Sequence, residues 1–337
     1  MSRKINLALV YGGDSSEWEV SVWSGRHVAA HIDKNKYAVY EVLLRGGNWQ
    51  VVKTDEGRVP EVAQAQIDKT DFSWVREGVK VRFDVVLLMI HGAPGEDGVL
   101  PAYFENLLIP HTSSLSRVSA LTFDKYACKS TLRSAGIVMA KDVLLQQNEE
   151  VDEQVVVDRL SLPLFVKPNR GGSSFGAAKV SRIGELAPAL ESAFRECTQV
   201  IVEEFIAGRE LTNGILKTHD RQVVLPVTEI VSKNDFFDYQ AKYQGASQEL
   251  TPAPIPDSLR DRIQQQTSKI YDCLGCSGFI RIDYIATGEE VIFLEVNTIP
   301  GMTEMSLVPQ QIREAGMSMG AFLELLIGEA LFRFGKV

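Results

Sequence analysis

The stretches Ile280-Arg-Ile-Asp-Tyr-Ile285 and Ile292-Phe-Leu-Glu-Val-Asn297 show the clearest structural pattern in this 337-residue chain. Polar and apolar residues alternate in both, as they do in β-strands that bury one face. A turn at 288–290 would join the two as an antiparallel hairpin. In that register the apolar face, which packs in a core, consists of Ile280, Ile282, Tyr284, Leu294 and Val296.

The other face of this hairpin gathers polar side chains. Asp283 lies opposite Glu295, and Arg281 lies opposite Asn297, so two carboxylates and one amide oxygen project side by side. Such hard oxygen ligands suit Mg²⁺ or Mn²⁺. The alternative is a solvated strand face with an arginine–carboxylate pair. We favour the metal site because the segment 298–302 follows at once and ends the strand in a rigid turn that exposes backbone groups.

A glycine- and serine-rich loop, Asn169-Arg-Gly-Gly-Ser-Ser-Phe-Gly176, follows a predicted strand at 164–167. Backbone N–H groups in such a loop can approach phosphate oxygens, and Lys167 places a positive charge beside them. The spacing matches neither the P-loop nor the Rossmann fingerprint. On its own, therefore, such a loop is far more often a simple turn than a phosphate-binding site.

Two segments near the N-terminus end predicted strands and are candidates for substrate binding. Glu17 lies where open α/β sheets bind ligands, and its carboxylate could hold an ammonium group. The alternative is a purely helical role, since Ser16 and Glu19 fit a capping box. The loop His91-Gly-Ala-Pro-Gly-Glu-Asp-Gly98 is consistent with a structural turn or a substrate pocket. His27 and His31 have zinc-like spacing but lack the accompanying glutamate, so we interpret both as ordinary helix residues.

The order of elements predicts an α/β protein with α+β character in its last part. We expect an N-terminal α/β domain at 1–115, a central unit at 116–208 and a C-terminal unit at 209–337. Residues 232–254 lack periodicity and predict a mobile loop that serves as a lid. The expected helices are 17–30, 117–134, 149–160, 257–274 and 319–334. The expected strands, besides the hairpin, are 5–10, 38–44, 83–90, 138–145, 164–167, 200–202, 212–216 and 222–227.

Composition limits the classes of partner. The 35 basic and 44 acidic residues give a net charge of −9 without a long basic block, which argues against nucleic acid. The longest apolar run, at 85–90, is far shorter than the ~20 residues of a membrane span. Four cysteines without a disulfide pattern favour a reducing, cytoplasmic location. Cys273 and Cys276 have the CxxC spacing of zinc or redox sites, but no second pair completes a site, so buried thiols are the favoured interpretation.

Five motifs, in this order, resemble those of the D-alanine–D-alanine ligases of the ATP-grasp superfamily along nearly the whole chain. They are Gly12-Gly-x-Ser-x-Glu17-x-Glu-Val-Ser21, His91-Gly-x-x-Gly-Glu-Asp-Gly98, Lys167-Pro-x-Arg-x-Gly-Ser-Ser174, Asp238-Tyr-x-Ala-Lys-Tyr243, and Arg281-x-Asp283 with Glu295-x-Asn-Thr-x-Pro-Gly-Met302. The resemblance implies an ATP-grasp fold of three domains, with ATP between the sheets of the second and third. The chain departs from the family pattern at Gly171, where an acidic residue is common, and at Tyr284, where an aliphatic residue is usual.

The resemblance also implies roles for single residues. Lys125 and Lys167 would contact the ATP phosphates, and Lys242 the γ-phosphate. Glu203, Phe205 and Ile206 would form the adenine-binding hinge, with Glu210 on the ribose. The implied ligands of two Mg²⁺ or Mn²⁺ ions are Asp283, Glu295 and Asn297. The implied residues of the D-alanine pocket are Glu17 (linked to Ser173 and Tyr243), His91, Arg281, Gly301, Ser306 and Leu307.

The implied reaction joins two D-alanines for peptidoglycan precursor synthesis, with ATP as co-substrate and D-alanyl phosphate as the intermediate. Tyr243 favours an amine acceptor over D-lactate, and a homodimer is expected. Two alternatives remain open at this point: another ATP-grasp ligase, and a nucleotide-binding regulator without turnover. A dehydrogenase ranks last because the nicotinamide fingerprint is incomplete.

Overall fold

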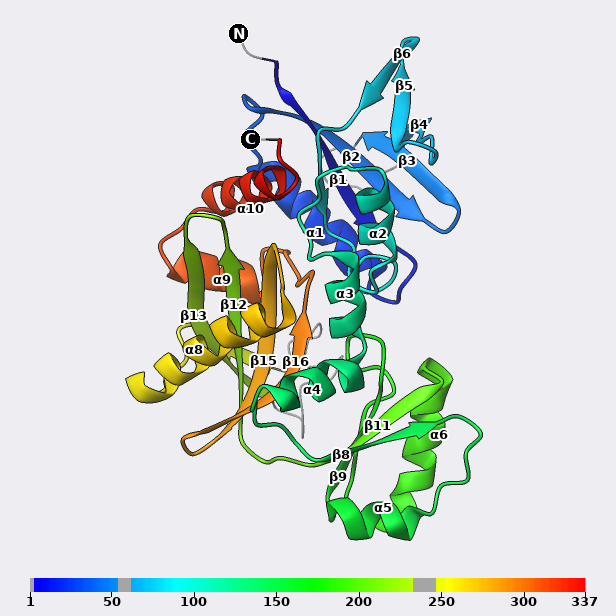
Figure 1. Cartoon of the computed structure of the whole chain (residues 1–337), viewed down its shortest axis with the longest axis vertical. Coiled ribbons are helices and arrows are strands. Elements are labelled where there is room, and N and C mark those ends of the chain that lie inside the picture. The colour runs from blue at the N-terminus through cyan, green and yellow to red at the C-terminus, as the bar shows by residue number, and fades with distance from the viewer. Residues whose placement is uncertain (1–2, 54–61, 233–246, 337) are drawn as a thin grey trace.

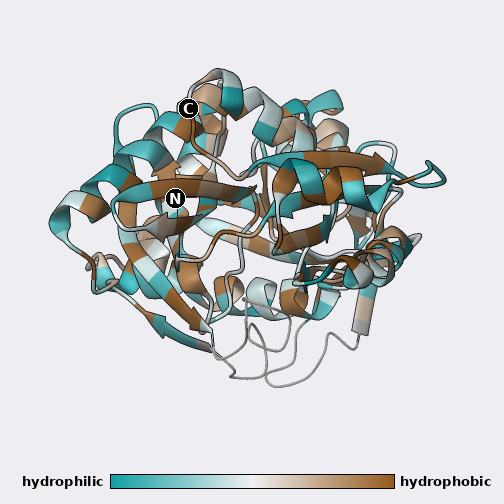
Figure 2. Cartoon of the chain, turned by 90° about the horizontal axis from the view of Figure 1, so that it is seen from below, coloured by the Kyte–Doolittle hydropathy of each residue, from teal (hydrophilic) through white to brown (hydrophobic). Residues whose placement is uncertain are grey.

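A computed structural model of the chain describes residues 3–53, 62–232 and 247–336. Its strands form three main sheets, each built from a separate part of the chain, and one two-stranded hairpin (Figure 1). Hydrophobic residues follow the inner strands, while the outer helices carry many hydrophilic residues (Figure 2). Among the described residues, no single helix is long and apolar enough to cross a membrane. One pair, α9 (Leu307–Glu314) with α10 (Met319–Arg333), meets that criterion only jointly, with a bend of 106° between the two helices.

The first sheet has the strand order β4-β3-β2-β1-β7. β1 lies parallel to both β2 and β7, which confirms the expected parallel unit. An antiparallel extension was not predicted: the two glycines 46 and 47 close a hairpin between β2 and β3, with Gly46 at φ +55°. The elements are β1 (Ile5–Gly12), α1 (Trp18–His31), β2 (Tyr37–Arg45), β3 (Asn48–Lys53), β4 (Val62–Gln66), β7 (Val85–Leu88), and the separate hairpin β5 (Ser73–Arg76) and β6 (Val79–Arg82).

The segment that follows this sheet forms α2 (Val99–Asn106), α3 (Ser116–Phe123) and α4 (Lys125–Ser134). The prediction of one helix over 117–134 was wrong, because Asp124 has an extended backbone and separates α3 from α4. Its carboxylate accepts a hydrogen bond from the Ala127 N–H at 3.0 Å and so caps α4. As a result Lys125 occupies the first position of a new helix.

The second sheet, β10-β9-β11-β8, is antiparallel and confirms the strands expected near 140, 165 and 200. Helices α5 and α6 lie beside it (Figure 1) and contribute apolar residues to its core. The elements are β8 (Asp142–Gln146), α5 (Glu153–Leu160), β9 (Leu164–Pro168), β10 (Ala178–Val180), the short helix η1 (Ile183–Glu185), α6 (Leu186–Glu196) and β11 (Gln199–Glu204).

The third sheet, β14-β13-β12-β15-β16, is antiparallel and packs against α8. Part of the segment predicted as a loop, 247–250, is the edge strand β14, which has one apolar residue and therefore no recognisable alternation. Residues 233–246 of that segment lie outside the described residues. The elements are β12 (Arg209–Lys217), β13 (Gln222–Ser232), β14 (Ser247–Leu250), α8 (Asp257–Leu274), β15 (Phe279–Thr287) and β16 (Glu290–Asn297).

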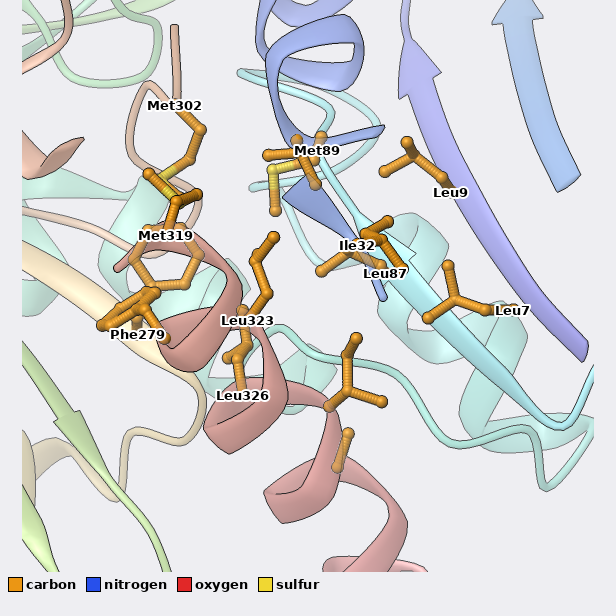
Figure 3. Close-up of a cluster of buried hydrophobic side chains, with 14 of the residues drawn as sticks. Leu7, Leu9, Ile32, Leu87, Met89, Phe279, Met302, Met319, Leu323 and Leu326 are labelled. Atoms are coloured by element: carbon orange, nitrogen blue, oxygen red, sulfur yellow. The ribbon is translucent and has the colours of Figure 1, made fainter. Parts of the chain in front are cut away.

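The last two helices are α9 (Leu307–Glu314) and α10 (Met319–Arg333), and α10 packs against the first sheet. Leu323 and Leu326 of α10 belong to the same buried cluster as Leu7 and Leu87 of the first sheet. Met302, from the turn after β16, is also in this cluster (Figure 3). The first and last parts of the chain therefore share a core, and this places the turn after β16 beside α1.

Candidate functional site

The β15–β16 hairpin has the predicted register at its polar end. Arg281 pairs with Asn297 and Asp283 with Glu295. The register then shifts by one residue after Asp283, which is a β-bulge. The prediction that Leu294 lies on the core face was therefore wrong: Leu294 is half-buried and lines a cavity on the same side as Glu295. Alternation alone cannot reveal a single extra residue in one strand.

Asp283 is nearly fully buried and accepts four hydrogen bonds. The Arg281 guanidinium donates two of them, from Nε at 2.9 Å and Nη2 at 2.8 Å. The Thr212 hydroxyl donates at 2.6 Å and the Asn297 amide at 3.1 Å. Burial alone lowers the pKa of Arg281, but its pairing with Asp283 outweighs this and raises the pKa overall, so the guanidinium stays charged. The arginine–carboxylate pair of the alternative interpretation is thus present, but it is buried and does not lie on a solvated strand face.

The donor set at this face fits a hard divalent cation. Asp283 and Glu295 supply carboxylates, and the Asn297 amide oxygen accepts no hydrogen bond within the part of the chain that the structure describes. No group of three or more His, Cys, Asp or Glu suited to a metal occurs among the described residues. A six-coordinate Mg²⁺ would therefore need further oxygens from water or from a bound phosphate, as is usual for this ion.

The larger of two neighbouring cavities, about 470 Å³, opens between the first and third sheets. Its wall includes most of the residues expected to bind D-alanine. They are Glu17, His91, Ser173, Arg281, Gly301, Ser306 and Leu307.

Glu17 lies directly before α1, and its carboxylate meets the glycine–serine loop. Ser173 donates a hydrogen bond to Glu17 Oε1 at 2.6 Å. A Cβ atom on Gly172 would lie 2.2 Å from Glu17 Oε2, so only glycine allows this approach. The capping box predicted for Ser16 and Glu19 is absent: Glu17 occupies the N-cap position without a side-chain cap, and Ser15 Oγ instead accepts a hydrogen bond from the Glu17 N–H.

Two consecutive residues of this loop have a strained backbone. Ser173 and Ser174 have φ values of +52° and +57°, which are uncommon for residues other than glycine. Lys125 Nζ donates to the Gly171 carbonyl at 2.7 Å and lies 3.8 Å from Glu295 Oε2. The loop is thereby held between the first sheet and the polar face of the β15–β16 hairpin, as strained segments at binding sites often are.

The second cavity lies between the second and third sheets and has a volume of about 160 Å³. Its wall contains every residue expected to bind ATP that lies within the described ranges: Lys125, Lys167, Glu203, Phe205, Ile206 and Glu210. The remaining expected residues, Lys242 of the ATP site and Tyr243 of the catalytic set, lie outside the described residues. The two cavities share Lys125, residues 171–173, Arg281 and Glu295.

The expected hinge carboxylate, Glu203, is buried between two lysines. Lys167 Nζ lies 2.8 Å from Glu203 Oε2, and Lys129 Nζ contacts Oε1. Burial raises the pKa of Glu203, but Lys167 and Lys129 outweigh this and lower it overall, so it remains an anionic acceptor. Lys129 also lies 2.6 Å from Asp142 Oδ2. Lys129 was not predicted from the sequence, although its position four residues after Lys125 puts it on the same helix face.

Two further carboxylates in the larger cavity were also missed. Glu96 accepts hydrogen bonds from the N–H groups of Gly92 and Ile299, and burial together with the nearby Glu17 raises its pKa to about 7. Glu249 of β14 contacts the Gln310 amide, and burial raises its pKa. Glu96 belongs to a quoted motif and could have been singled out there. Glu249 lies in the segment interpreted as a loop, where nothing marked it.

The four cysteines are free thiols that differ in burial. Cys276 and Cys128 are buried in the core of the third sheet, and Cys273 is exposed. Burial raises the pKa of Cys128 to about 12, as expected for an inert thiol. The interpretation as a buried thiol is confirmed for Cys276 and was wrong for Cys273, which lies on the exposed side of α8.

Comparison with known proteins gives a consistent assignment. Residues 6–114 match a family profile described as "D-ala D-ala ligase N-terminus", and residues 131–328 match "D-ala D-ala ligase C-terminus". A protein of Phocaeicola vulgatus named D-alanine--D-alanine ligase is 47% identical over 94% of this chain and 96% of its own length. One of the same name from Porphyromonas gingivalis is 40% identical over 98% of each chain.

Solved structures agree with this assignment. The VanG D-Ala:D-Ser ligase from Enterococcus faecalis superposes with a TM-score of 0.86 at 35% identity, covering 97% of this chain and 100% of that one. The D-alanine--D-alanine ligase from Bacillus anthracis complexed with ATP gives a TM-score of 0.78 at 28% identity, covering 98% of both chains. The expected α/β, ATP-grasp fold class is confirmed. The chain belongs to the D-alanine–D-alanine ligase family.

Proposed function

We propose that this protein joins two D-alanines to D-alanyl-D-alanine, at the expense of ATP, for peptidoglycan precursor synthesis. The observation that supports this most is the common wall of the two cavities, formed by Lys125, residues 171–173, Arg281 and Glu295. A phosphoryl group can pass from a nucleotide in one cavity to a carboxylate in the other across this wall. The names of the relatives supply the identity of the amino acid.

In the first proposed step, a D-alanine carboxylate oxygen attacks the γ-phosphorus of ATP, the bond to the β-phosphate bridging oxygen breaks, and ADP leaves. Glu17, held by Ser173, binds the ammonium of this first D-alanine. Lys125 and Lys167 bind phosphate oxygens and offset the charge that develops during transfer. Glu203 remains an anion and accepts a hydrogen bond from the adenine amine, beside Phe205 and Ile206, while Glu210 binds the ribose.

Divalent cations complete this site in the proposal. Asp283, Glu295 and Asn297 would hold Mg²⁺ or Mn²⁺, two ions by resemblance to the family. The cations would supply positive charge to the phosphate oxygens of the nucleotide.

In the second proposed step, the amine of the second D-alanine attacks the carbonyl carbon of D-alanyl phosphate, loses a proton, and phosphate leaves. Arg281 and the Gly301 N–H stabilise the oxyanion of the tetrahedral intermediate. Ser306 and Leu307, at the start of α9, bind the carboxylate of the second D-alanine. His91 completes the wall of this pocket.

We also propose a cytoplasmic homodimer whose domains divide near residues 115 and 208. Four cysteines without a disulfide fit a reducing compartment, and each sheet falls within one of these ranges. Sedimentation velocity at micromolar concentration tests the dimer: a single species of 37.4 kDa would contradict it.

The deciding experiment measures D-alanine-dependent ADP release, with the product identified by mass spectrometry. D-Serine or D-lactate is added as a competing acceptor to reactions in which D-alanine is limiting, and a reaction with D-alanine alone is the reference. These acceptors are chosen because one solved relative is a D-Ala:D-Ser ligase. We expect D-alanyl-D-alanine as the main product. Faster formation of a D-serine or D-lactate product would refute the proposed acceptor. Absence of D-alanine-dependent ADP release would favour another ATP-grasp ligase or a nucleotide-binding regulator.

A further inference from the structure

The turn after β16, residues 299–302, is held at its first end by the loop that follows β7. The Ile299 N–H donates to Glu96 Oε1 at 3.1 Å. The Ile299 carbonyl accepts a hydrogen bond from His91 Nδ1 at 2.7 Å. Both backbone polar groups of Ile299 are therefore bound by side chains about 200 residues earlier in the chain.

The last residue of the turn is held in the same way by α1. The Met302 N–H donates to Ser24 Oγ at 3.1 Å, and the Met302 carbonyl accepts from His27 Nδ1 at 2.7 Å. Ser24 and His27 are three residues apart and so lie on one face of the helix. The Met302 side chain is buried in the core shared with α10 (Figure 3). The turn is thus fixed at both ends, and Gly301 lies between the fixed points.

One hydrogen-bond chain links the two ends of the turn. His91 Nδ1 faces a carbonyl oxygen, so it must carry the proton, and the neutral ring then has Nε2 as an acceptor. The Ser24 hydroxyl lies 2.9 Å from His91 Nε2 and donates to it. The same oxygen accepts the Met302 N–H. Each of the three donors in this hydrogen-bond network, the Met302 N–H, the Ser24 hydroxyl and His91 Nδ1, therefore has one acceptor.

Because its residues are buried, this hydrogen-bond network is sensitive to the loss of any one of its polar groups. Ser24 and Met302 are fully buried, and His91 is 4% exposed. Removal of the Ser24 hydroxyl would leave the Met302 N–H without its acceptor and His91 Nε2 without its donor. A buried group without a partner costs more than the hydrogen bond was worth, so the turn would shift to find other partners.

We propose that Ser24 is a positioning residue for the ligation reaction, acting through His91 and the turn 299–302 on the Gly301 backbone. This inference rests on the proposed function, in which the Gly301 N–H faces the oxyanion. Among the described residues, Ser24 is not part of the wall of the larger cavity. Its effect on catalysis must therefore pass through its two partners, His91 and the turn.

The test compares Ser24→Ala with Ser21→Ala. Ser21 is a matched control because it is also fully buried in α1 and its hydroxyl also makes two hydrogen bonds, to the Met89 carbonyl at 2.5 Å and from the Gly12 N–H at 2.8 Å. These bonds join α1 to the ends of β1 and β7 and do not involve the turn 299–302. We expect both variants to lower the melting temperature, and only Ser24→Ala to lower kcat, by about 10- to 100-fold, because displacement of a stabilising group by ~1 Å has effects of this size. The KM for ATP should not change.

A double-mutant cycle and a conservative variant complete the test. If Ser24 acts through His91, the loss of kcat in Ser24→Ala/His91→Asn is smaller than the product of the two single losses. Ser24→Thr keeps the hydroxyl and should recover most of the kcat, whatever its stability. Equal kcat in Ser24→Ala and Ser21→Ala, fully multiplicative losses, or a Ser24→Thr as slow as Ser24→Ala would each overturn the inference. An inactive wild-type protein would instead overturn the proposed function.

Discussion

Replacement of Gly172 by alanine should selectively weaken binding and use of the first D-alanine. The added Cβ would lie 2.2 Å from Glu17 Oε2 and 2.8 Å from Glu17 Cδ, whereas real Cβ contacts are not closer than 3.0 Å. The carboxylate or the loop must therefore move by roughly 1 Å. The backbone of Gly172 is not in the left-handed region, so steric contact with Glu17 is the main cost.

The size of the effect follows from the contact that is lost. The hydrogen bond from Ser173 to Glu17, 2.6 Å long, involves a charged acceptor. Such bonds contribute about 1.5–3 kcal/mol. A loss of this size in the transition state lowers kcat/KM by roughly 10- to 150-fold. We therefore expect kcat/KM for the first D-alanine to fall within this range, while the Kd of ATP stays close to that of the wild type.

The assay is the initial rate of ADP release against D-alanine concentration at saturating ATP, with ATP binding measured separately by calorimetry. Gly184→Ala is the control, because a Cβ at that position meets no atom within 4 Å. Its kinetics should match the wild type. If Gly172→Ala keeps the wild-type kcat/KM, the Glu17 carboxylate does not bind the substrate from this position, and the reasoning fails.

Three further predictions concern buried or coordinating charges. Glu295→Ala should abolish ADP release at any Mg²⁺ concentration with little change in melting temperature, because this side chain is 30% exposed; retained Mg²⁺-dependent activity would remove the metal assignment. Lys129→Met should lower the free energy of unfolding in urea by about 1.5–3 kcal/mol, since it removes the buried cation shared by Glu203 and Asp142, which then keep only Lys167 and Arg133 as partners; a loss below about 1 kcal/mol would contradict this. In the folded protein the pKa of Glu96 is raised from 4.5 to about 7. As the pH rises from about 4.5 to about 7, the unfolded chain therefore releases this proton while the folded protein retains it, and the free energy of unfolding falls by up to about 3 kcal/mol. Glu96→Gln should remove that dependence in urea titrations at pH 5 and pH 8, and an unchanged pH dependence would show that another group causes it.

Local patterns in the sequence were sufficient to predict which polar residues of the β15–β16 hairpin lie opposite each other. Alternation in two adjacent strands and a glycine turn between them fix which residues oppose each other, and Asp283 does pair with Glu295. The bulge at Leu294 was not predictable, because a shift of one residue leaves both flanking patterns intact. The break between α3 and α4 was likewise not predictable. The spacing of apolar residues is the same whether Asp124 caps a new helix or lies inside one long helix.

The residues that hold the site together could not be found from local patterns, because their partners are remote in sequence. His27 illustrates the reason. Its spacing from His31 suggested only a metal site or an ordinary helix residue, yet its ring binds the carbonyl of Met302, 275 residues later. That contact exists because α10 packs on the first sheet and brings the turn after β16 to α1. The candidate ligand-binding residues lie at strand ends and in loops, and sequence periodicity predicts where strands end. Positioning residues such as His27 can be identified only from the tertiary structure, because their partners are remote in sequence. For this reason a substitution in α1 can affect chemistry at Gly301 without a contact to any substrate.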